Sequence, residues 1–124
     1  MTHPSRVGDL MSTAMVFVRD TDTIETARHE MHRAGFRHLP VVDEHRNLVG
    51  IISSTDLGSG RHALVASGRV GGSMSRVVVT VTPDTSVTLA RALMLENAFH
   101  SLPVVASDGH VVGILTETDL LRGR

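Results

Sequence analysis

The residues best suited to chemistry in this chain are two hydroxyl–carboxylate pairs with the same spacing. Ser53 is followed three positions later by Asp56, and Thr116 is followed by Asp119. Each pair comes directly after an apolar run, so the hydroxyl is expected at a helix start and the carboxylate one turn further on. Free N–H groups and a hydroxyl at a helix start favour an anion such as phosphate, and an ionised carboxylate accepts both hydroxyls of a vicinal diol. An ordinary helix N-cap followed by a favourable acid explains the same spacing without a ligand.

Both pairs are preceded by the same order of predicted elements. Short β-rich runs at 14–18 and 77–81 predict strands, and each is followed by a polar helix start, at 20–23 and at 83–86. Asp22 and Glu25 have the spacing of a capping box. Apolar residues at helical spacing then follow in each half: Ile24, Ala27, Met31 and Ala34, and Val87, Ala90, Met94 and Ala98.

These helices are expected to end near Gly35 and Ala98. Each half then has two short strands joined by a polar turn, predicted at 39–42 and 48–52 and at 102–105 and 111–115. A last helix begins at Ser53 in the first half and at Thr116 in the second. The hydroxyl–carboxylate pairs therefore lie at the junction of the third strand and the last helix.

A shift of 63 positions lays the second half of the chain on the first without a gap. Met11 falls on Met74, Phe36 on Phe99, and the run Leu-Pro-Val-Val at 39–42 on the same run at 102–105. Such self-similarity indicates a duplication. Because roughly fifty residues bury a core poorly, two β-α-β-β-α units are expected to pack about a pseudo-twofold axis into one globular module. The expected boundaries are 7–57 for the first unit, 58–69 for a linker and 70–122 for the second unit.

On these motifs the chain resembles a pair of CBS domains, named from cystathionine β-synthase, which together are called a Bateman module. The motifs are the Leu-Pro-Val-Val strand and the junctions Gly-Ile-Ile-Ser-Ser-Thr-Asp at 50–56 and Gly-Ile-Leu-Thr-Glu-Thr-Asp at 113–119. The resemblance implies an α/β (α+β) fold without catalysis of its own. It implies adenine-nucleotide binding in clefts between the units, with AMP, ADP or ATP as ligand and S-adenosylmethionine or NAD as alternatives. It also implies a homodimer that controls a partner protein.

The resemblance assigns a role to each candidate site residue. Asp119 and Asp56 would bind ribose, and phosphate would be bound by Thr116, Ser53, His100, His38 and Arg37. The adenine slot would be lined by Ala14, Met15, Val16, Val77, Val78 and Val79. Most of these valines are expected to belong to the plain core, and the three basic residues are equally explained as a solvated strand start. Phe36 and Phe99 are expected to cover helix ends, and Met11 and Met74 to pack at the start of each unit.

Composition excludes several other functions. The formal net charge is −1 and the only aromatics are three phenylalanines, so a nucleic-acid partner is not expected. There is no cysteine, no signal-like or membrane-spanning apolar run, and no resident cofactor is expected; a cytoplasmic location fits these features. His29 and His32 have the spacing of metal ligands but lack an evident third ligand, so no metal site is expected. The glycines of 58–63 are expected to shorten the last helix of the first unit. The two rivals are a ligand-free interaction or dimerisation module and a small metallo-enzyme.

Overall fold

The computed structural model describes residues 6–13, 16–58, 68–76 and 78–122. The chain forms two compact units. Residues 16–78 form one, called here the first-repeat unit, and residues 1–15 together with 79–124 form the other, the second-repeat unit. The leading segment of each repeat therefore belongs to the unit built around the other repeat.

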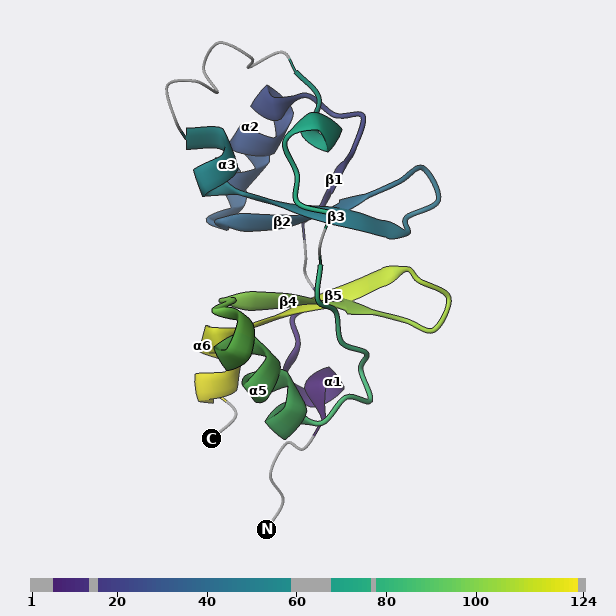
Figure 1. The fold of residues 1–124 in the computed structure, drawn as a ribbon, viewed down its shortest axis with the longest axis vertical. Helices are drawn as coiled ribbons and strands as arrows, with labels where there is room; N and C mark the ends of the chain where they lie inside the picture. Colours follow the sequence, from purple (N-terminus) through teal and green to yellow (C-terminus); the bar gives the residue numbers. More distant parts are fainter. Residues whose placement is uncertain (1–5, 14–15, 59–67, 77, 123–124) are drawn as a thin grey trace. The chain divides into compact units, whose positions relative to one another are not determined.

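The first-repeat unit is a three-stranded sheet covered by two helices. Its strands are β1 (Val18–Arg19), β2 (His38–Val42) and β3 (Leu48–Ser53), in the order β1-β2-β3. Strand β1 is parallel to β2, and β2 is antiparallel to β3. Helices α2 (Ile24–Ala34) and α3 (Ser54–Gly58) lie on one side of this sheet (Figure 1), and η1 (Val70–Gly72) is a single 3-10 turn. The expected order β-α-β-β-α is confirmed here.

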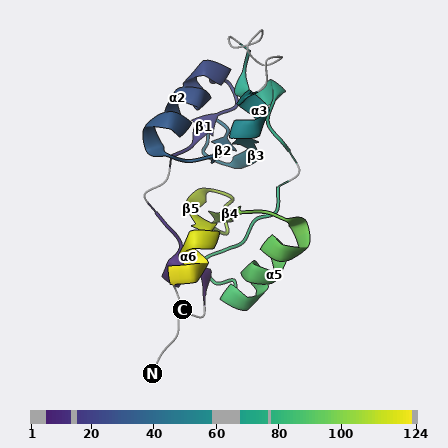
Figure 2. The ribbon, with the colours of Figure 1, turned by 90° about the vertical axis from the view of Figure 1, so that its left-hand side faces the viewer.

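The second-repeat unit also has helices packed on a sheet, but its sheet has two strands and not three. Antiparallel strands β4 (Ser101–Val105) and β5 (Val111–Thr116) form the sheet. Helices α1 (Val7–Leu10), α5 (Val87–Asn97) and α6 (Glu117–Arg122) lie on one side of it, as the view in Figure 2 shows. The two sheets, one mixed and one antiparallel, with their helices confirm the predicted α+β class.

Of the predicted strand at 77–81, Val77 lies outside the described residues, residues 78–80 are not part of a strand, and only Val81 is paired. Val81 makes a single parallel bridge to Val104, which matches the pairing of Val18 with Val41 in the other unit. In the first-repeat unit the N–H of Asp20 extends the ladder by donating to Val42 O over 3.2 Å. Pro83 stands at the equivalent position and has no N–H to donate, so the ladder stops. In the strand predicted at 14–18, residues 14 and 15 lie outside the described residues; of the described residues, 16 and 17 are not part of a strand, and pairing with β2 begins at Val18 and continues to Arg19.

The exchanged leading segments pair with the last strand of each sheet. Ser75 and Ile51 exchange two backbone hydrogen bonds of 2.8 and 3.0 Å, and Ser12 and Ile114 exchange two of 2.9 and 3.0 Å. Beside these bridges a Cβ on Gly50 would lie 2.6 Å from Met74 Sδ, and one on Gly113 would lie 2.9 Å from Met11 Sδ. A glycine inside a strand often marks such a close approach. The two methionines do pack in cores, but in the unit formed by the other repeat.

The helix ends follow the predicted caps with one correction. Thr23 and Ser86 are the N-cap residues, and their hydroxyls accept from Thr26 N and Leu89 N. The expected Asp22–Glu25 capping box is not formed, since Asp22 accepts from Arg19 N and Glu25 pairs with Arg28. Both helices end as predicted, at Gly35 and Ala98, whose positive φ angles of 75° and 55° turn the chain out of the helix.

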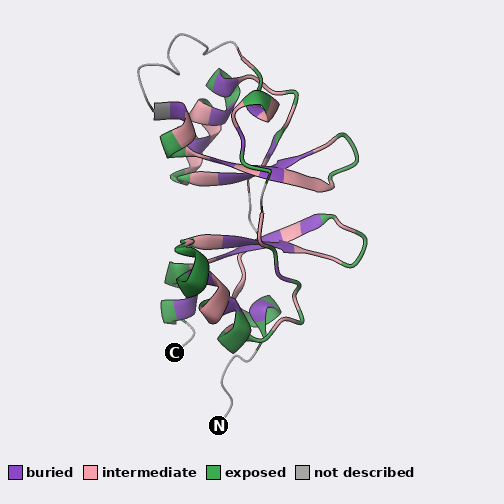
Figure 3. Ribbon diagram, viewed as in Figure 1, coloured by how far each residue is buried: buried purple, intermediate pink, exposed green. Residues whose placement is uncertain are grey.

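Each unit has its own hydrophobic core between its helices and its sheet. Figure 3 shows the buried residues along the strands and on one side of each long helix. The first core contains Val18, Ile24, Ala27, Met31, Leu39, Val41, Ile52, Leu57, Val70 and Met74. The second contains Val7, Val81, Ala90, Met94, Leu102, Val104, Leu115 and Leu120. Phe36 and Phe99 pack against these cores just beyond the helix ends, as expected.

Candidate functional site

The two hydroxyl–carboxylate pairs form equivalent capping arrangements at the start of α3 and of α6. Ser53 N donates to Asp56 Oδ2 over 2.9 Å, and Asp56 N donates to Ser53 Oγ over 3.2 Å. Thr116 N donates to Asp119 Oδ2 over 2.9 Å, and Asp119 N donates to Thr116 Oγ1 over 3.2 Å. These reciprocal bonds fix the carboxylates in one rotamer, as a capping box does.

Capping uses only one oxygen of each carboxylate. Asp56 also accepts from Ser53 Oγ through Oδ2, over 3.0 Å. Among the described residues, the Oδ1 atoms of Asp56 and Asp119 accept no hydrogen bond, and both side chains are half-buried. The capping role and a ligand-binding role are therefore compatible, because the cap leaves the second oxygen available.

The strand start before each Leu-Pro-Val-Val run lies beside the capping box. His38 pairs with Ser53 in the β2–β3 register, and Ser54 N donates to Arg37 O over 2.7 Å. His38 is half-buried and Arg37 is exposed. The predicted phosphate-binding residues of the first repeat, Arg37, His38 and Ser53, thus come together in one small region with Asp56.

The second repeat repeats this backbone arrangement with different side chains. Ser101 pairs with Thr116, and Glu117 N donates to His100 O over 3.1 Å. The Nδ1 atom of His100 contacts Glu117 Oε1 directly. His100 is one of the predicted phosphate-binding residues, whereas Glu117 was not predicted to be part of the site. The signal was available in the repeat, since a shift of 63 places Glu117 on the neutral Ser54.

The adenine slot is only partly described. Ala14, Met15 and Val77 lie outside the described residues. Val16 is half-buried and packs against the first core, and Val79 is half-buried and packs against the second. Val78 is half-buried as well. Half-buried apolar side chains are thus present in both predicted parts of the slot, at Val16 and at Val78 and Val79.

The remaining histidines give no sign of a metal centre in the described ranges. His29 and His32 are exposed on α2. Within residues 6–13, 16–58, 68–76 and 78–122, no three His, Asp or Glu side chains gather closely enough to hold a metal ion. In the same ranges, no helix has the length and apolar character needed to cross a membrane.

Known proteins similar to this chain share both its sequence pattern and its fold. Residues 7–58 and 68–124 each match the CBS domain family. Homoserine O-acetyltransferase of Methanococcoides burtonii is 35% identical over 98% of this chain, which spans only 24% of that protein. An uncharacterized 17.7 kDa protein of Acidianus ambivalens is 33% identical over 95% of this chain and 72% of its own length.

Three solved structures carry the comparison further. The CBS domain pair of protein MJ0100, in complex with 5′-methylthioadenosine and S-adenosylmethionine, superposes with a TM-score of 0.83 at 31% identity, covering 94% of this chain and 93% of that chain. CBSX2 in complex with AMP gives a TM-score of 0.82 at 30% identity, with 94% and 93% covered. The cytosolic domain of the Mg²⁺ channel MgtE in complex with ATP gives 0.84 at 33% identity, with 95% and 48% covered. With the family matched in both halves and CBS domain pairs among the structures that share its fold, this chain belongs to the CBS domain family as a tandem pair.

Proposed function

We propose that this CBS pair is a regulatory module that reversibly binds an adenosine-containing ligand and carries out no chemistry on it. The observation that carries the proposal is the pair of capped carboxylates, Asp56 and Asp119, each with one oxygen left without a partner among the described residues. Solved CBS pairs with the same fold bind AMP, ATP, or 5′-methylthioadenosine and S-adenosylmethionine. AMP, ADP and ATP are the first ligands to test.

Each residue has a defined task in this proposal. The free Oδ1 atoms of Asp56 and Asp119 accept the ribose hydroxyls, because a carboxylate is an acceptor only. Ser53 contributes a hydroxyl near the phosphates, and Thr116 contributes the equivalent hydroxyl in the second repeat. Arg37 contributes positive charge, and Arg37 and His38 contribute N–H donors. Adenine rests against apolar side chains such as Val16 and Val79. Ligand binding then shifts the balance of the module's conformations and so controls a partner protein.

A thermal-unfolding panel tests this proposal. AMP, ADP, ATP, S-adenosylmethionine and NAD are added to the wild type, Asp56→Asn and Asp119→Asn, with each unliganded protein as its own baseline. Asparagine keeps one side-chain oxygen for the cap and removes the charge. A ligand present at 100 times its Kd adds about 2.7 kcal/mol, which raises Tm by about ten degrees for a chain of this size. A shift that one substitution abolishes supports the proposal, whereas no shift with any ligand at millimolar concentration leaves the interaction module as the better account.

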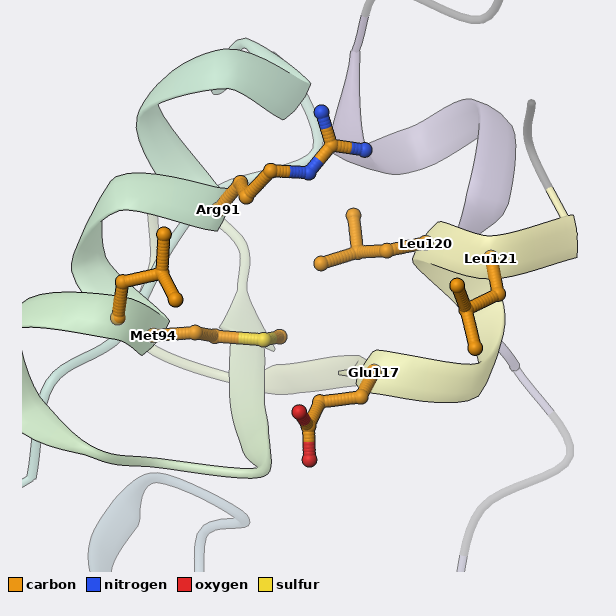
Figure 4. A pocket seen from close by; sticks show the side chains of 6 residues that line it. Arg91, Met94, Glu117, Leu120 and Leu121 are labelled. Atoms are coloured by element: carbon orange, nitrogen blue, oxygen red, sulfur yellow. The ribbon is translucent and has the colours of Figure 1, made fainter.

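A second role, self-association, is favoured by an apolar face on the second-repeat unit. Leu95 and Leu121 are 77% and 61% exposed, and both line a groove between α5 and α6. Figure 4 shows Leu120 and Met94 on the floor of this groove, with Arg91 and Glu117 near its ends. Two exposed leucines beside an apolar groove suit a twofold contact, in which the same face of each copy covers that of the other. We propose that this face pairs with the same face of a second copy.

The homodimer is tested by light scattering coupled to size exclusion. Leu95→Glu and Leu121→Glu are expected to give monomers because each places a charge in the apolar contact. His32→Glu is the matched control, since His32 occupies the equivalent position to Leu95 in the first repeat and lines the corresponding groove. A wild type that is monomeric, or variants that still dimerise, would count against this face.

A further inference from the structure

We infer that the two repeats select different adenosine ligands, and that Glu117 is the residue that sets the difference. The site of the second repeat would take an adenosine that carries no phosphate on its 5′ carbon. The site of the first repeat would take an adenosine 5′-phosphate. This inference rests on the proposed function, because it assumes that both carboxylates bind ribose.

The two sites share their backbone and differ in charge. Arg37 O accepts from Ser54 N in the first repeat, and His100 O accepts from Glu117 N in the second. The same two positions therefore lie side by side in both units. They hold Arg37 and a neutral serine in one unit, but histidine and a carboxylate in the other.

The side-chain contacts reinforce this contrast. The Arg37 guanidinium has no ion-pair partner among the described residues and stays available for an anion. In the second repeat, His100 is held by the Glu117 carboxylate. His100 therefore interacts with Glu117 and not with a ligand, and Glu117 adds a negative charge to that of Asp119 at the start of α6.

Charge repulsion decides which ligand each region tolerates. A nucleotide phosphate carries up to two negative charges, so it is repelled by Glu117 and attracted by Arg37. A thioether or a sulfonium group on the 5′ carbon carries no negative charge and meets no such penalty, and a sulfonium is attracted. Because Glu117 and His100 are 59% and 71% exposed, the effect is screened by salt and is expected to be moderate.

Isothermal titration with AMP and with 5′-methylthioadenosine tests the inference one site at a time. The Asp56→Asn background reports the second site, and the Asp119→Asn background reports the first. In the Asp56→Asn background, Glu117→Ser and Glu117→Gln are each expected to strengthen AMP binding about tenfold at low salt. The affinity for 5′-methylthioadenosine should change less than about twofold.

Reciprocal and control variants complete the design. In the Asp119→Asn background, Ser54→Glu should weaken AMP binding and leave 5′-methylthioadenosine binding unchanged. Glu44→Gln removes one exposed charge from the β2–β3 turn and should alter neither ligand. The gain from Glu117→Gln should shrink as salt is raised.

The outcomes separate this inference from the proposed function. If both ligands bind through the aspartates but Glu117→Gln leaves their ratio unchanged, the inference is wrong and the proposed function stands. If neither ligand binds the wild type, both are wrong. If Glu117→Gln raises the affinities for AMP and for 5′-methylthioadenosine equally, Glu117 acts through the shape of the site and not through its charge, and the inference is also overturned.

Discussion

Gly50→Ala is expected to destabilise the first-repeat unit severely, because the exchanged segment passes too close for a methyl group. A Cβ at this position would lie 2.6 Å from Met74 Sδ and 2.7 Å from the carbonyl oxygen of Ser75. The methionine side chain is flexible and can move, but the carbonyl belongs to a backbone that is tied to Ile51 by two hydrogen bonds. The methyl group must therefore either push the segment away or distort β3.

The expected cost follows from these two effects. Overpacking of a close-packed interior costs about 1–3 kcal/mol, and each weakened backbone hydrogen bond adds about 1 kcal/mol. We expect a loss of about 2–4 kcal/mol, which is a large share of the stability of a typical domain. Gly113→Ala should cost less, since the equivalent distances to Met11 Sδ and Ser12 O are both 2.9 Å.

Urea denaturation followed by circular dichroism measures the difference. Gly72→Ala is the matched control, because it lies in the same exchanged segment and its added Cβ would meet nothing within 4 Å. Its effect should stay within about 0.5 kcal/mol. If Gly50→Ala is as stable as Gly72→Ala, the close pairing of Ser75 with Ile51 does not exist in solution and the exchange of segments is wrong.

Three further predictions concern the helix ends, the β2–β3 turn and the α3 cap. Ala98→Gly should raise the free energy of unfolding by about 0.5–1 kcal/mol in urea titration, because Ala98 has a φ of 55° that glycine adopts without strain; an unchanged or lower stability would argue against this left-handed cap. The pKa of Asp43 is lowered chiefly by the N–H of Asn47, which donates to Asp43 Oδ1 over 2.9 Å. The ionised Asp43 carboxylate therefore stabilises the fold fully above its unfolded pKa of about 4, and this stabilisation is lost as pH falls through the lower folded pKa. Asp43→Asn should therefore flatten the decline in stability below pH 5, and an unaltered pH profile would contradict that. Ser53→Ala should lose about 1 kcal/mol of stability with its cap, as measured by chemical denaturation, and no loss would show that Asp56 caps α3 unaided.

The sequence predicted the parts of the fold that depend on local signals. The apolar spacing of Ile24, Ala27 and Met31 gave the first long helix, and the Leu-Pro-Val-Val runs gave β2 and β4. The exchange of leading segments was missed, because residues 7–12 and 70–75 are too short to show a period and their partners are far along the chain. Gly50 and Gly113 were the available signal, since a glycine inside a strand often faces a neighbouring backbone.

The same distinction applies to the site. The spacing of Ser53 and Asp56 predicted that they would meet, since three residues at a helix start bring the groups together. It could not show that capping occupies Oδ2 and leaves Oδ1, because that depends on the side-chain rotamer. Nor could it show that His100 pairs with Glu117, because that pairing requires the start of β4 to lie beside the start of α6.

Calorimetric titration of the protein with AMP and with its 2′,3′-dideoxy analogue measures how much the ribose hydroxyls contribute to binding. Hydrogen bonds to a charged group are worth about 1.5–3 kcal/mol each, so removing both ribose hydroxyls should weaken binding to the wild type by about a hundredfold or more. In the Asp56→Asn, Asp119→Asn double variant the two ligands should bind equally weakly, because the carboxylates that distinguish them are gone. Equal affinity of the wild type for AMP and the dideoxy analogue would contradict the role of Asp56 and Asp119 as ribose acceptors.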